Sequence, residues 1–441
     1  MPGGLTTFTT FSPLDAAERY LDGQPDDVTV AVALSGGGDS VGLLAALGEA
    51  PACRSRRVRL AAITIDHRLR PESAGEAAAM ADFCRTLSVP HLTLAWGGEK
   101  PRTGLSEAAR QARYRLLAEG ARQLGADCLV TAHTLDDQLE TVEMRRRRSE
   151  TSPRGLAGIA PCALFFGTLA VHRPFLKVGR TEIRTYLSER GIVWIDDPSN
   201  ENPLYERVRV RQAGQFANDA DAIDDAARRR SALAEGAARH LQAHARMPLP
   251  LLFALDLAEA DKDISDLALA TLIAVAGGQM HLPGREQLER LRLALRTDEG
   301  NAAVSLGRTV VERRKAVLYI GRDRRNLPSV DLLPGERTDW DDRFRIDNDT
   351  HGPVTVRPAD AGEGSDAVPA RIGQRALATL PACAALHLEG VGVPVRPLLA
   401  PYETILTSFD KPLADAVCHL TGRPLFPCFV SAGLEAASRS G

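Results

Sequence analysis

VAVALSGGGDS, residues 30–40, is the stretch that decides the fold class of this chain. It begins as a short run of β-branched and small apolar residues, which is typical of a strand buried on both faces. It ends in a glycine cluster flanked by serines, and helical spacing follows over residues 40–50. A strand, a glycine turn and a helix in this order indicate the start of a βαβ unit.

The segments that follow alternate between strand and helix patterns. The expected strands cover residues 28–34, 58–65, 91–95 and 127–131, and the expected helices cover residues 40–50, 73–87, 106–124 and 136–148. This alternation predicts an α/β fold with a doubly wound, Rossmann-like parallel sheet. Ligands of such sheets bind at the carboxyl ends of the strands, so the residues after 34, 65 and 131 are the candidates for a site.

The rest of the chain predicts two further domains. An Ala/Arg-rich helix is expected over 216–244, broken by MPLP at 247–250, and a second helical zone and a β-like stretch at 302–320 follow. After residue 327 the sequence becomes turn-rich and acidic. We therefore expect an α/β domain over 1–215, a mostly helical domain over 216–327 and a small mixed or β-rich domain over 328–441.

Composition narrows the classes of protein. With 441 residues, 44% hydrophobic and 25% charged, the chain matches an average globular protein rather than a disordered one. The N-terminus has neither a basic region nor an apolar core, and no apolar run is long enough to span a bilayer, so a cytoplasmic protein without a membrane partner is expected. Seven cysteines without a CxxC pair disfavour a disulfide framework or a structural zinc site.

The glycine cluster predicts a phosphate-binding loop. Consecutive glycines and a helix N-terminus present free amides to an anion, and a carboxylate beside them can hold Mg²⁺ bound to the phosphates. A Walker loop is excluded because no lysine follows a glycine, and Val41 disfavours the dinucleotide fingerprint. A ligand-free turn is less favoured between a strand and a helix. The expected ATP-binding residues are Ser35, Gly36, Gly37, Gly38, Asp39 and Ser40.

Two further clusters also contain candidate site residues. IDHRLRPES, residues 65–73, follows the second strand, where Asp66 is a candidate for contact with adenine or ribose. An Asx turn with a helix cap explains this stretch equally well. In ARQARYRLL, residues 109–117, Arg110 and Arg113 share a helix face and could grip a phosphate or a carboxylate, although solvated arginines are the more ordinary interpretation.

The fourth cluster, TAHTLDDQLETVEM at 131–144, follows the fourth strand. Asp136, Asp137 and Glu140 lie within about one helical turn. Attraction to the helix dipole explains one acidic residue more easily than three, so a pocket for Mg²⁺ or for a cationic substrate is the alternative. His133 is either a core histidine or a phosphate contact.

These motifs carry a family resemblance. SGGGDS in its strand–helix context resembles the PP-loop signature of the ATP pyrophosphatases that cleave ATP between the α and β phosphates. The four clusters together, with RPFL at 173–176 and DPSN at 197–200, resemble the bacterial tRNA(Ile)-lysidine synthase family. The resemblance covers residues 28–211 well, the middle of the chain loosely and about the last hundred residues poorly.

The resemblance implies a reaction, cofactors and partners. Family members adenylate the C2 carbonyl oxygen of the wobble cytidine in tRNA(Ile) with a CAU anticodon, and the ε-amine of L-lysine then displaces AMP. ATP and Mg²⁺ are the implied cofactors. By resemblance, Asp137 and Glu140 hold the ammonium groups of lysine, Arg113 and His133 face the adenylate, and Asp39 assists departure of Mg²⁺–pyrophosphate. Thr134 stands where the family usually has a second histidine.

Basic residues near these motifs are the expected contacts with the tRNA backbone, and the domain over 216–327 is expected to bind tRNA. Phosphate contacts of this kind give an affinity that falls with salt. The last third of the chain could recognise the acceptor stem, form a homodimer or stabilise the fold. The expected tRNA-binding residues are Arg145, Arg146, Arg147, Arg148, Arg207, Arg209 and Arg211.

Two alternatives stay open on the sequence. A thiolase-like PP-loop enzyme would also adenylate a tRNA base, but its sulfur relay generally uses cysteines in CxxC pairs, which this chain lacks. A non-catalytic protein that binds nucleotide or tRNA would not need Asp39, Asp137 and Glu140. Formation of AMP only when tRNA and lysine are both present would separate these alternatives from the ligase.

Overall fold

The computed structural model describes residues 11–101, 103–148, 153–196, 206–213, 220–258, 260–296, 301–360, 368–382 and 393–429. The chain forms two compact units, and the division falls after Arg230, within helix α10. The second unit is Ser231–Pro427, and Cys428 and Phe429 belong to the first.

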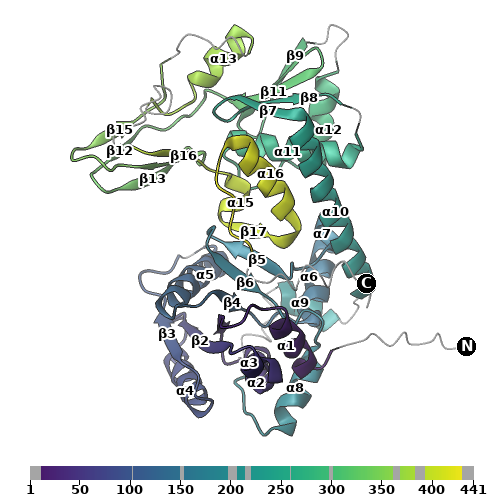
Figure 1. The fold of residues 1–441 in the computed structure, drawn as a ribbon, viewed down its shortest axis with the longest axis vertical. Coiled ribbons are helices and arrows are strands. Elements are labelled where there is room, and N and C mark those ends of the chain that lie inside the picture. The colour runs from purple at the N-terminus through teal and green to yellow at the C-terminus, as the bar shows by residue number, and fades with distance from the viewer. Residues whose placement is uncertain are drawn as a thin grey trace, which may run out of the picture. The chain divides into compact units, whose positions relative to one another are not determined.

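The first unit contains the alternating strands and helices that the sequence predicts (Figure 1). Its elements in chain order are α1 (Pro13–Asp22), β1 (Thr29–Ala33), α2 (Gly38–Glu49), α3 (Pro51–Ser55), β2 (Arg59–Asp66), α4 (Ser73–Thr86), β3 (His91–Ala95), α5 (Leu105–Gln123), β4 (Cys128–Val130), α6 (Leu135–Arg147), α7 (Pro153–Leu156), β5 (Cys162–Phe165), β6 (Leu169–His172), α8 (Arg180–Glu189), α9 (Glu206–Ala213) and α10 (Ala220–His244).

Strand β1 lies inside a mainly parallel sheet with the order β5-β6-β4-β1-β2-β3. Val30 pairs with Leu60 of β2 on one side and with Cys128 of β4 on the other, both in parallel register. Strand β5 pairs antiparallel with β6. The chain leaves β1 toward β2 and later returns to the other side of β1 as β4, so the carboxyl ends of β1 and β4 meet at a switch point of the topology. The predicted parallel α/β sheet is confirmed.

Strand β1 lies in the core of this unit, with both of its faces covered. All five residues of β1 are buried, as expected for a parallel strand with both faces covered. On one face Ala31 and Ala33 pack beneath Leu117 of α5. Tyr114 of the same helix stacks on Phe165 of β5, with ring centroids 3.9 Å apart. These contacts fix α5, and with it the arginines near its middle, over the carboxyl half of the sheet.

The second unit combines helices with three smaller sheets. Its elements after α10 are β7 (Ala245–Leu249), β8 (Leu252–Asp256), α11 (Lys262–Gly277), α12 (Arg285–Ala294), β9 (Asn301–Leu306), β10 (Thr309–Arg314), β11 (Val317–Arg322), β12 (Val330–Leu332), β13 (Arg337–Trp340), β14 (Phe344–Asp347), β15 (Val354–Val356), α13 (Ala370–Leu377), β16 (Val395–Pro397), α15 (Ala400–Glu403), β17 (Ile405–Thr407), the 3₁₀ helix η2 (Ser408–Asp410) and α16 (Lys411–Thr421).

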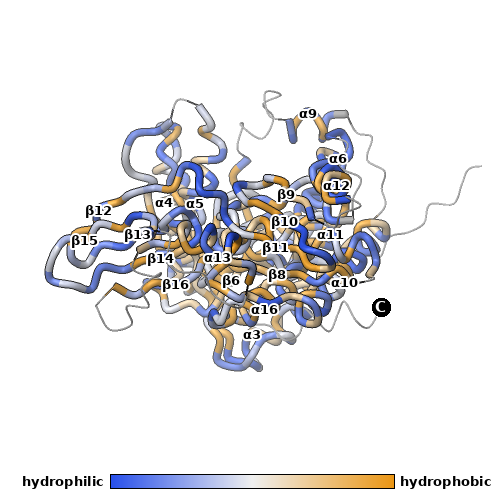
Figure 2. Tube along the Cα trace, turned by 90° about the horizontal axis from the view of Figure 1, so that it is seen from above, coloured by the Kyte–Doolittle hydropathy of each residue, from blue (hydrophilic) through white to orange (hydrophobic). Residues whose placement is uncertain are grey.

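A five-stranded antiparallel sheet, β7-β8-β11-β10-β9, follows α10. The expected β-like stretch corresponds to β9–β11, and α11 and α12 supply the expected helices. Strands β7 and β8 were not expected; the sequence showed only a helix breaker at 247–250, where β7 now ends. The hydrophobic residues of β8, buried from Leu252 to Leu255, stand out in Figure 2. The expected boundary near 215 falls outside the described residues, and the one near 327, which we retain as a proposal, falls between β11 and β12.

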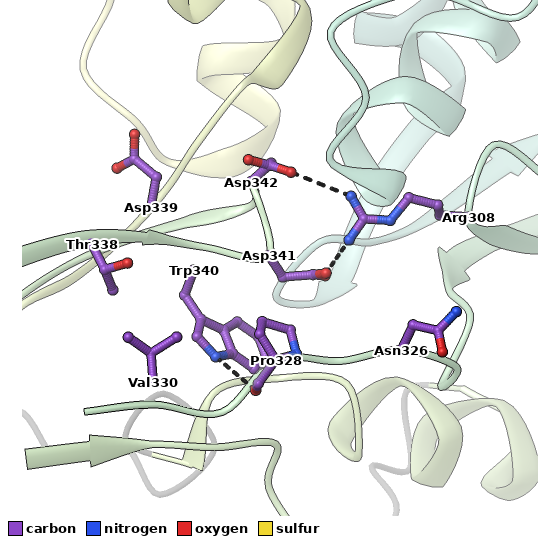
Figure 3. A pocket seen from close by; sticks show the side chains of 9 residues that line it. All are labelled: Arg308, Asn326, Pro328, Val330, Thr338, Asp339, Trp340, Asp341 and Asp342. Atoms are coloured by element: carbon purple, nitrogen blue, oxygen red, sulfur yellow. Dashed lines mark hydrogen bonds and ion pairs between the residues drawn. The ribbon is translucent and has the colours of Figure 1, made fainter. Parts of the chain in front are cut away.

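A buried charge network holds the turn between β13 and β14. Asp341 has no exposed side-chain surface and ion-pairs with Arg308, Arg322 and Arg343, the last two almost fully buried. Figure 3 shows Arg308 reaching both Asp341 and Asp342 beside a pocket of about 320 Å³. The neighbouring Gly278 has φ +63°, and a Cβ there would lie 2.5 Å from the Asp341 carbonyl oxygen. This pocket contains none of the sequence-predicted site residues.

Candidate active site

The predicted phosphate loop forms a tight turn between β1 and α2. Ser40 Oγ donates to the Gly37 carbonyl oxygen at 2.9 Å and accepts the Ser35 amide at 3.1 Å, which closes the turn. Gly36 has φ +90°, a conformation that favours glycine. Among the described residues, the amides from Gly36 to Asp39 have no acceptor. Unpaired amides at a helix N-terminus are donors for an anion.

The segment before residue 197 packs directly on this loop. The Ile195 amide donates to the Gly36 carbonyl oxygen at 2.9 Å. A Cβ on Gly36 would lie 2.9 Å from Ile195 Cδ1, and one on Gly38 would lie 3.3 Å from Trp194 Cδ1. Gly36 is therefore required for packing as well as for backbone conformation, whereas a Cβ on Gly38 would make a tight contact with the Trp194 ring. The DPSN motif, 197–200, lies outside the described residues.

Asp39 stands in the first turn of α2 with a third of its side chain exposed. Burial, opposed by Arg180 and reinforced by the nearby Asp137, raises the pKa of Asp39 to about 6. A carboxylate held this close to other carboxylates is a group that a cation would stabilise. No group of three or more His, Cys, Asp or Glu side chains suited to a metal occurs in the part of the chain that the structure describes.

Asp66, at the end of β2, makes the Asx turn that the sequence left open as an alternative. Its Oδ1 accepts the Arg68 amide at 2.8 Å and the Ser73 hydroxyl at 2.7 Å. Although burial opposes it, these bonds lower the pKa of Asp66. His67 lies beside it with a buried Nδ1 that has no hydrogen-bond partner in the described structure. The Asx turn therefore engages one oxygen of Asp66 and leaves Oδ2 as the candidate atom for a nucleoside.

Asp137 serves two purposes at the start of α6. Its Oδ2 accepts the Thr134 amide at 2.8 Å, and Thr134 Oγ1 in turn accepts the Asp137 amide, which completes a capping box. The other oxygen, Oδ1, lies 2.6 Å from Arg180 Nη2. Helix capping therefore explains one oxygen of Asp137, and the second belongs to a charged cluster.

Three arginines neutralise that cluster. Arg180 Nη1 lies 2.8 Å from Glu140 Oε1, and Arg211 Nε lies 2.9 Å from the same oxygen. Arg207 Nε is 2.8 Å from Glu140 Oε2 and its Nη2 is 3.4 Å from Asp137 Oδ1. Glu140 is 1% exposed. The sequence assigned Arg207 and Arg211 to tRNA; the structure places both, from α9, against the acidic residues of α6.

His133 lies among arginines at the end of β4. Its Nδ1 is 2.9 Å from Thr131 Oγ1. Burial, together with Arg173, Arg113 and other nearby arginines, holds the pKa of His133 well below its usual value. The imidazole is therefore neutral at pH 7 and able to donate or accept a hydrogen bond. The structure thus brings the predicted residues Arg113 and His133 into one electropositive region.

The arginine run at the end of α6 divides into different roles. Arg145 Nη1 donates to the carbonyl oxygens of Gly155 and Gly158, at 2.8 and 3.0 Å. Arg147 pairs with Glu143, and Arg148 pairs with Glu206. Arg146 has no partner in the described part of the chain, and Arg209 of α9 is exposed. Arg146 is therefore the arginine of this run that we keep as a candidate for contact with a tRNA phosphate.

Sequence reasoning missed two groups that shape the site. Arg180 is the first residue of α8, where the helix dipole disfavours a cation, and this mismatch was the available signal. Arg173 belongs to the RPFL motif, which contributed to the family resemblance but was not predicted to be part of the site. The Arg173 side chain is buried and donates a hydrogen bond to the Ala160 carbonyl oxygen at 2.7 Å. Both positions are distant in sequence from the motifs they contact.

A phosphate-type loop at the switch point of a parallel sheet, with an acidic cluster beside it, defines a PP-loop, ATP-binding class of enzyme, and a PP-loop domain family model matches residues 15–214. A tRNA(Ile)-lysidine synthase from Rhizobium meliloti is 38% identical over 94% of this chain and 96% of its own. The corresponding protein from Mesorhizobium japonicum is 37% identical over 90% and 92%. The chain belongs to the tRNA(Ile)-lysidine synthase family.

Among solved structures, a U34-tRNA thiolase from Methanococcus maripaludis is similar at 17% identity over 48% of this chain and 76% of that one, with a TM-score of 0.40. This likeness carries no argument about function. No helix in the described residues is both long and apolar enough to cross a membrane.

Proposed function

We propose that this protein is an ATP-dependent ligase that joins L-lysine to C2 of the wobble cytidine in CAU-anticodon tRNA(Ile), with release of AMP and pyrophosphate. Family membership supports the ligase reaction on tRNA. Two kinds of group at the carboxyl ends of the strands carry the site assignment. They are the unpaired amides of residues 36–39, in the loop and first turn of α2, and the carboxylates of Asp137 and Glu140 on α6.

In this mechanism the loop amides hold the phosphates of ATP while the C2 oxygen of cytidine attacks the α phosphorus. Pyrophosphate leaves, and the ε-amino group of lysine, in its neutral form, then forms a bond to C2 as the C2–O bond to AMP breaks and a proton is lost from the nitrogen. Fixed donors that face developing charge in a partly dry site lower such barriers. Arg113 stabilises the adenylate, and the neutral His133 is placed to hydrogen-bond to it. Asp137 and Glu140 bind the ammonium groups of lysine.

Asp39 is the residue that would hold Mg²⁺. The donor chemistry fits, because Mg²⁺ prefers one or two carboxylates together with substrate phosphates, and Asp39 follows the loop glycines directly. Mg²⁺ would supply charge neutralisation of the departing pyrophosphate. Asp39 itself orients that end of the nucleotide toward the loop.

A direct test incubates the protein with ATP, radiolabelled L-lysine and an unmodified CAU-anticodon transcript. We expect label in the tRNA with one AMP formed per lysine joined. A transcript with uridine in place of the wobble cytidine is the control and should take no label. Formation of ADP instead of AMP would contradict cleavage of ATP between the α and β phosphates, which PP-loop enzymes carry out. Formation of AMP without transfer of lysine would support a different base-modifying reaction. Sedimentation of the same preparation checks whether the protein forms a homodimer.

Asp137→Asn is expected to raise the KM for lysine about 10- to 100-fold, because a charge-assisted hydrogen bond contributes roughly 1.5–3 kcal/mol. The asparagine oxygen can still accept the Thr134 amide, so the cap of α6 is kept. The loss of the carboxylate that pairs with Arg180 should lower the melting temperature, so KM is compared at a temperature at which the variant is folded. Steady-state kinetics with varied lysine measures the effect. An unchanged KM would mean that Asp137 acts in capping alone.

Arg146→Glu is expected to weaken tRNA binding about tenfold at low salt and to lower the salt slope by about one, as for the loss of one phosphate contact. ATP binding should be unaffected. Arg54→Glu is the matched control. The Arg54 side chain is exposed and has no partner among the described residues. It lies on α3, just before β2 begins, and so at the amino ends of the strands rather than at the carboxyl ends. Filter binding across a salt series measures both. If Arg146→Glu and Arg54→Glu lost tRNA affinity equally, the effect would come from the change in net charge and not from a contact of Arg146.

A further inference from the structure

The two oxygens proposed to receive the lysine ammonium already have a cation between them. Asp137 Oδ1 lies 2.6 Å from Arg180 Nη2, and Glu140 Oε1 lies 2.8 Å from Arg180 Nη1. The two ends of a single guanidinium therefore span the acidic pair. An ammonium group that is to bind both oxygens must compete with Arg180 for them.

The same side chain also reaches the phosphate loop. Arg180 Nε lies 3.4 Å from Asp39 Oδ2, a longer contact than the two on α6. Asp39 directly follows the three glycines, whose amides have no acceptor in the described structure. Arg180 is thus in contact with both halves of the site, the nucleotide side through Asp39 and the amine side through Asp137 and Glu140.

The position of Arg180 in its helix is unfavourable for local reasons. It is the first residue of α8, and its side chain is 19% exposed. A cation at a helix N-terminus is repelled by the dipole, and burial removes hydration from the guanidinium. The carboxylates around it therefore hold it in place, and a stronger anion nearby would compete with them for it.

A bound triphosphate is such an anion. Guanidinium groups bind phosphate oxygens in a bidentate manner, with charge-assisted hydrogen bonds. A nucleotide in the loop would offer the guanidinium a partner on the Asp39 side, in competition with its bonds to the acidic pair. Arg207 and Arg211 keep part of the negative charge of Glu140 neutralised meanwhile.

We propose that Arg180 is a positioning residue that occupies the amine subsite until nucleotide binds, so that ATP opens the site for lysine. This inference rests on the proposed function and adds an order to it: nucleotide first, amine second. The order suits the chemistry, since the amine has nothing to attack before the cytidine is adenylated. Because coupling between two binding sites is reciprocal, lysine must increase the affinity for nucleotide by the same factor as nucleotide increases the affinity for lysine.

The test measures binding of radiolabelled L-lysine by equilibrium dialysis, with and without the α,β-methylene analogue of ATP and Mg²⁺. The unmodified transcript is present in every arm. The analogue blocks cleavage between the α and β phosphates, so no turnover occurs. For the unaltered protein we expect lysine to bind about tenfold more tightly when the analogue is present, within the usual range of coupling between sites.

Arg180→Gln is expected to bind lysine equally with and without the analogue, and more tightly than the unaltered protein when nucleotide is absent. Arg180→Lys keeps a cation and should restore part of the coupling. Arg190→Gln is the matched control, because Arg190 directly follows the last residue of α8 and pairs with Glu49; its coupling should be that of the unaltered protein. Analogue binding and melting temperature show that each variant is folded.

Several outcomes would overturn the inference. These are equal lysine affinity with and without analogue in the unaltered protein, no lysine binding in either arm, or full coupling in Arg180→Gln. The first two need no variant, so they decide the matter even if substitutions at 180 prevent folding. Lysidine formation by the unaltered protein is assayed in parallel. If lysidine forms and coupling is absent, only the role of Arg180 fails; if no lysidine forms, the proposed function fails.

Discussion

Asp39→Asn is expected to lose adenylation by at least about 100-fold and yet to melt at a higher temperature than the unaltered protein. The loss of activity follows from the proposed role of the carboxylate at the phosphate end of ATP. Removing one preorganised electrostatic group from such a site commonly costs about 10²–10³ in rate. The asparagine has the same shape, so the loop hydrogen bonds of Ser35 and Ser40 should persist.

The gain in stability follows from the raised pKa of Asp39, which lies near 6 in the folded protein against 3.8 for an ordinary aspartate. A group with a raised pKa stabilises the fold while protonated, below about pH 4, and this stability is lost as the pH rises through 6. At pH 7 the ionised carboxylate is therefore unfavourable. Two pKa units correspond to roughly 3 kcal/mol.

Since a third of the Asp39 side chain is exposed, screening by water reduces the expected gain to about 1 kcal/mol, or about 2–4 °C. Pyrophosphate release measures the activity, and thermal melts at pH 7 and pH 4 measure the stability. The difference in melting temperature should shrink at pH 4. Asp82→Asn, an exposed residue of α4 paired with Arg85, is the control and should leave both quantities unchanged. Retained adenylation would show that Asp39 has no part in that step.

The alternating first half of the fold could be predicted because its signals are local. Strands β1 to β4 and helices α2, α4, α5 and α6 each combine one hydrophobic period with glycine or acidic residues at their ends, and their bounds differ from expectation by only a few residues. The hairpin β5–β6 was missed. It lies in one continuous apolar run, where strand and turn cannot be separated by period, and its turn is formed by Phe166 and Gly167, both with positive φ.

The site was predictable only as separate motifs. Asp136, Asp137 and Glu140 share a helical turn, and this spacing is visible in the sequence. The cation that joins them is not, because Arg180 is 40 residues from Glu140 along the chain and enters from a different helix. From their charge, the sequence assigned Arg207 and Arg211 to the tRNA backbone, whereas the ion pairs that they form depend on how α9 packs against α6. Long-range ion pairs of this kind leave no periodic signal.

Asp341→Asn is expected to destabilise the second unit by about 3–5 kcal/mol. One carboxylate there binds Arg322 through both oxygens, at 3.0 and 3.1 Å, and Arg343 at 2.6 Å, and it also pairs with Arg308. Burial, together with the neighbouring Arg322 and Arg308, lowers the pKa of Arg343 to about 10 even though Asp341 opposes the shift. Removing the carboxylate with which the buried Arg322 and Arg343 pair leaves these two cations uncompensated, which costs more than the pairs themselves contribute.

The neighbouring residue provides a matched control for this prediction. Asp342 has the same left-handed backbone, with φ 58° against 56° for Asp341, so asparagine suits both positions equally. Its side chain, however, is 68% exposed and lies 3.4 Å from Arg308, and such surface pairs contribute about 0–1 kcal/mol. Asp342→Asn should therefore change stability little.

Trp340 is the single tryptophan of the second unit and is 1% exposed. With Trp96 and Trp194 replaced by phenylalanine, its fluorescence during urea unfolding reports on that unit alone. The two asparagine variants should then differ by several kcal/mol at unchanged m-value. Equal midpoints would mean that water or a rearranged side chain neutralises the arginines once Asp341 is gone, and that the turn between β13 and β14 is held by backbone packing on Gly278 instead.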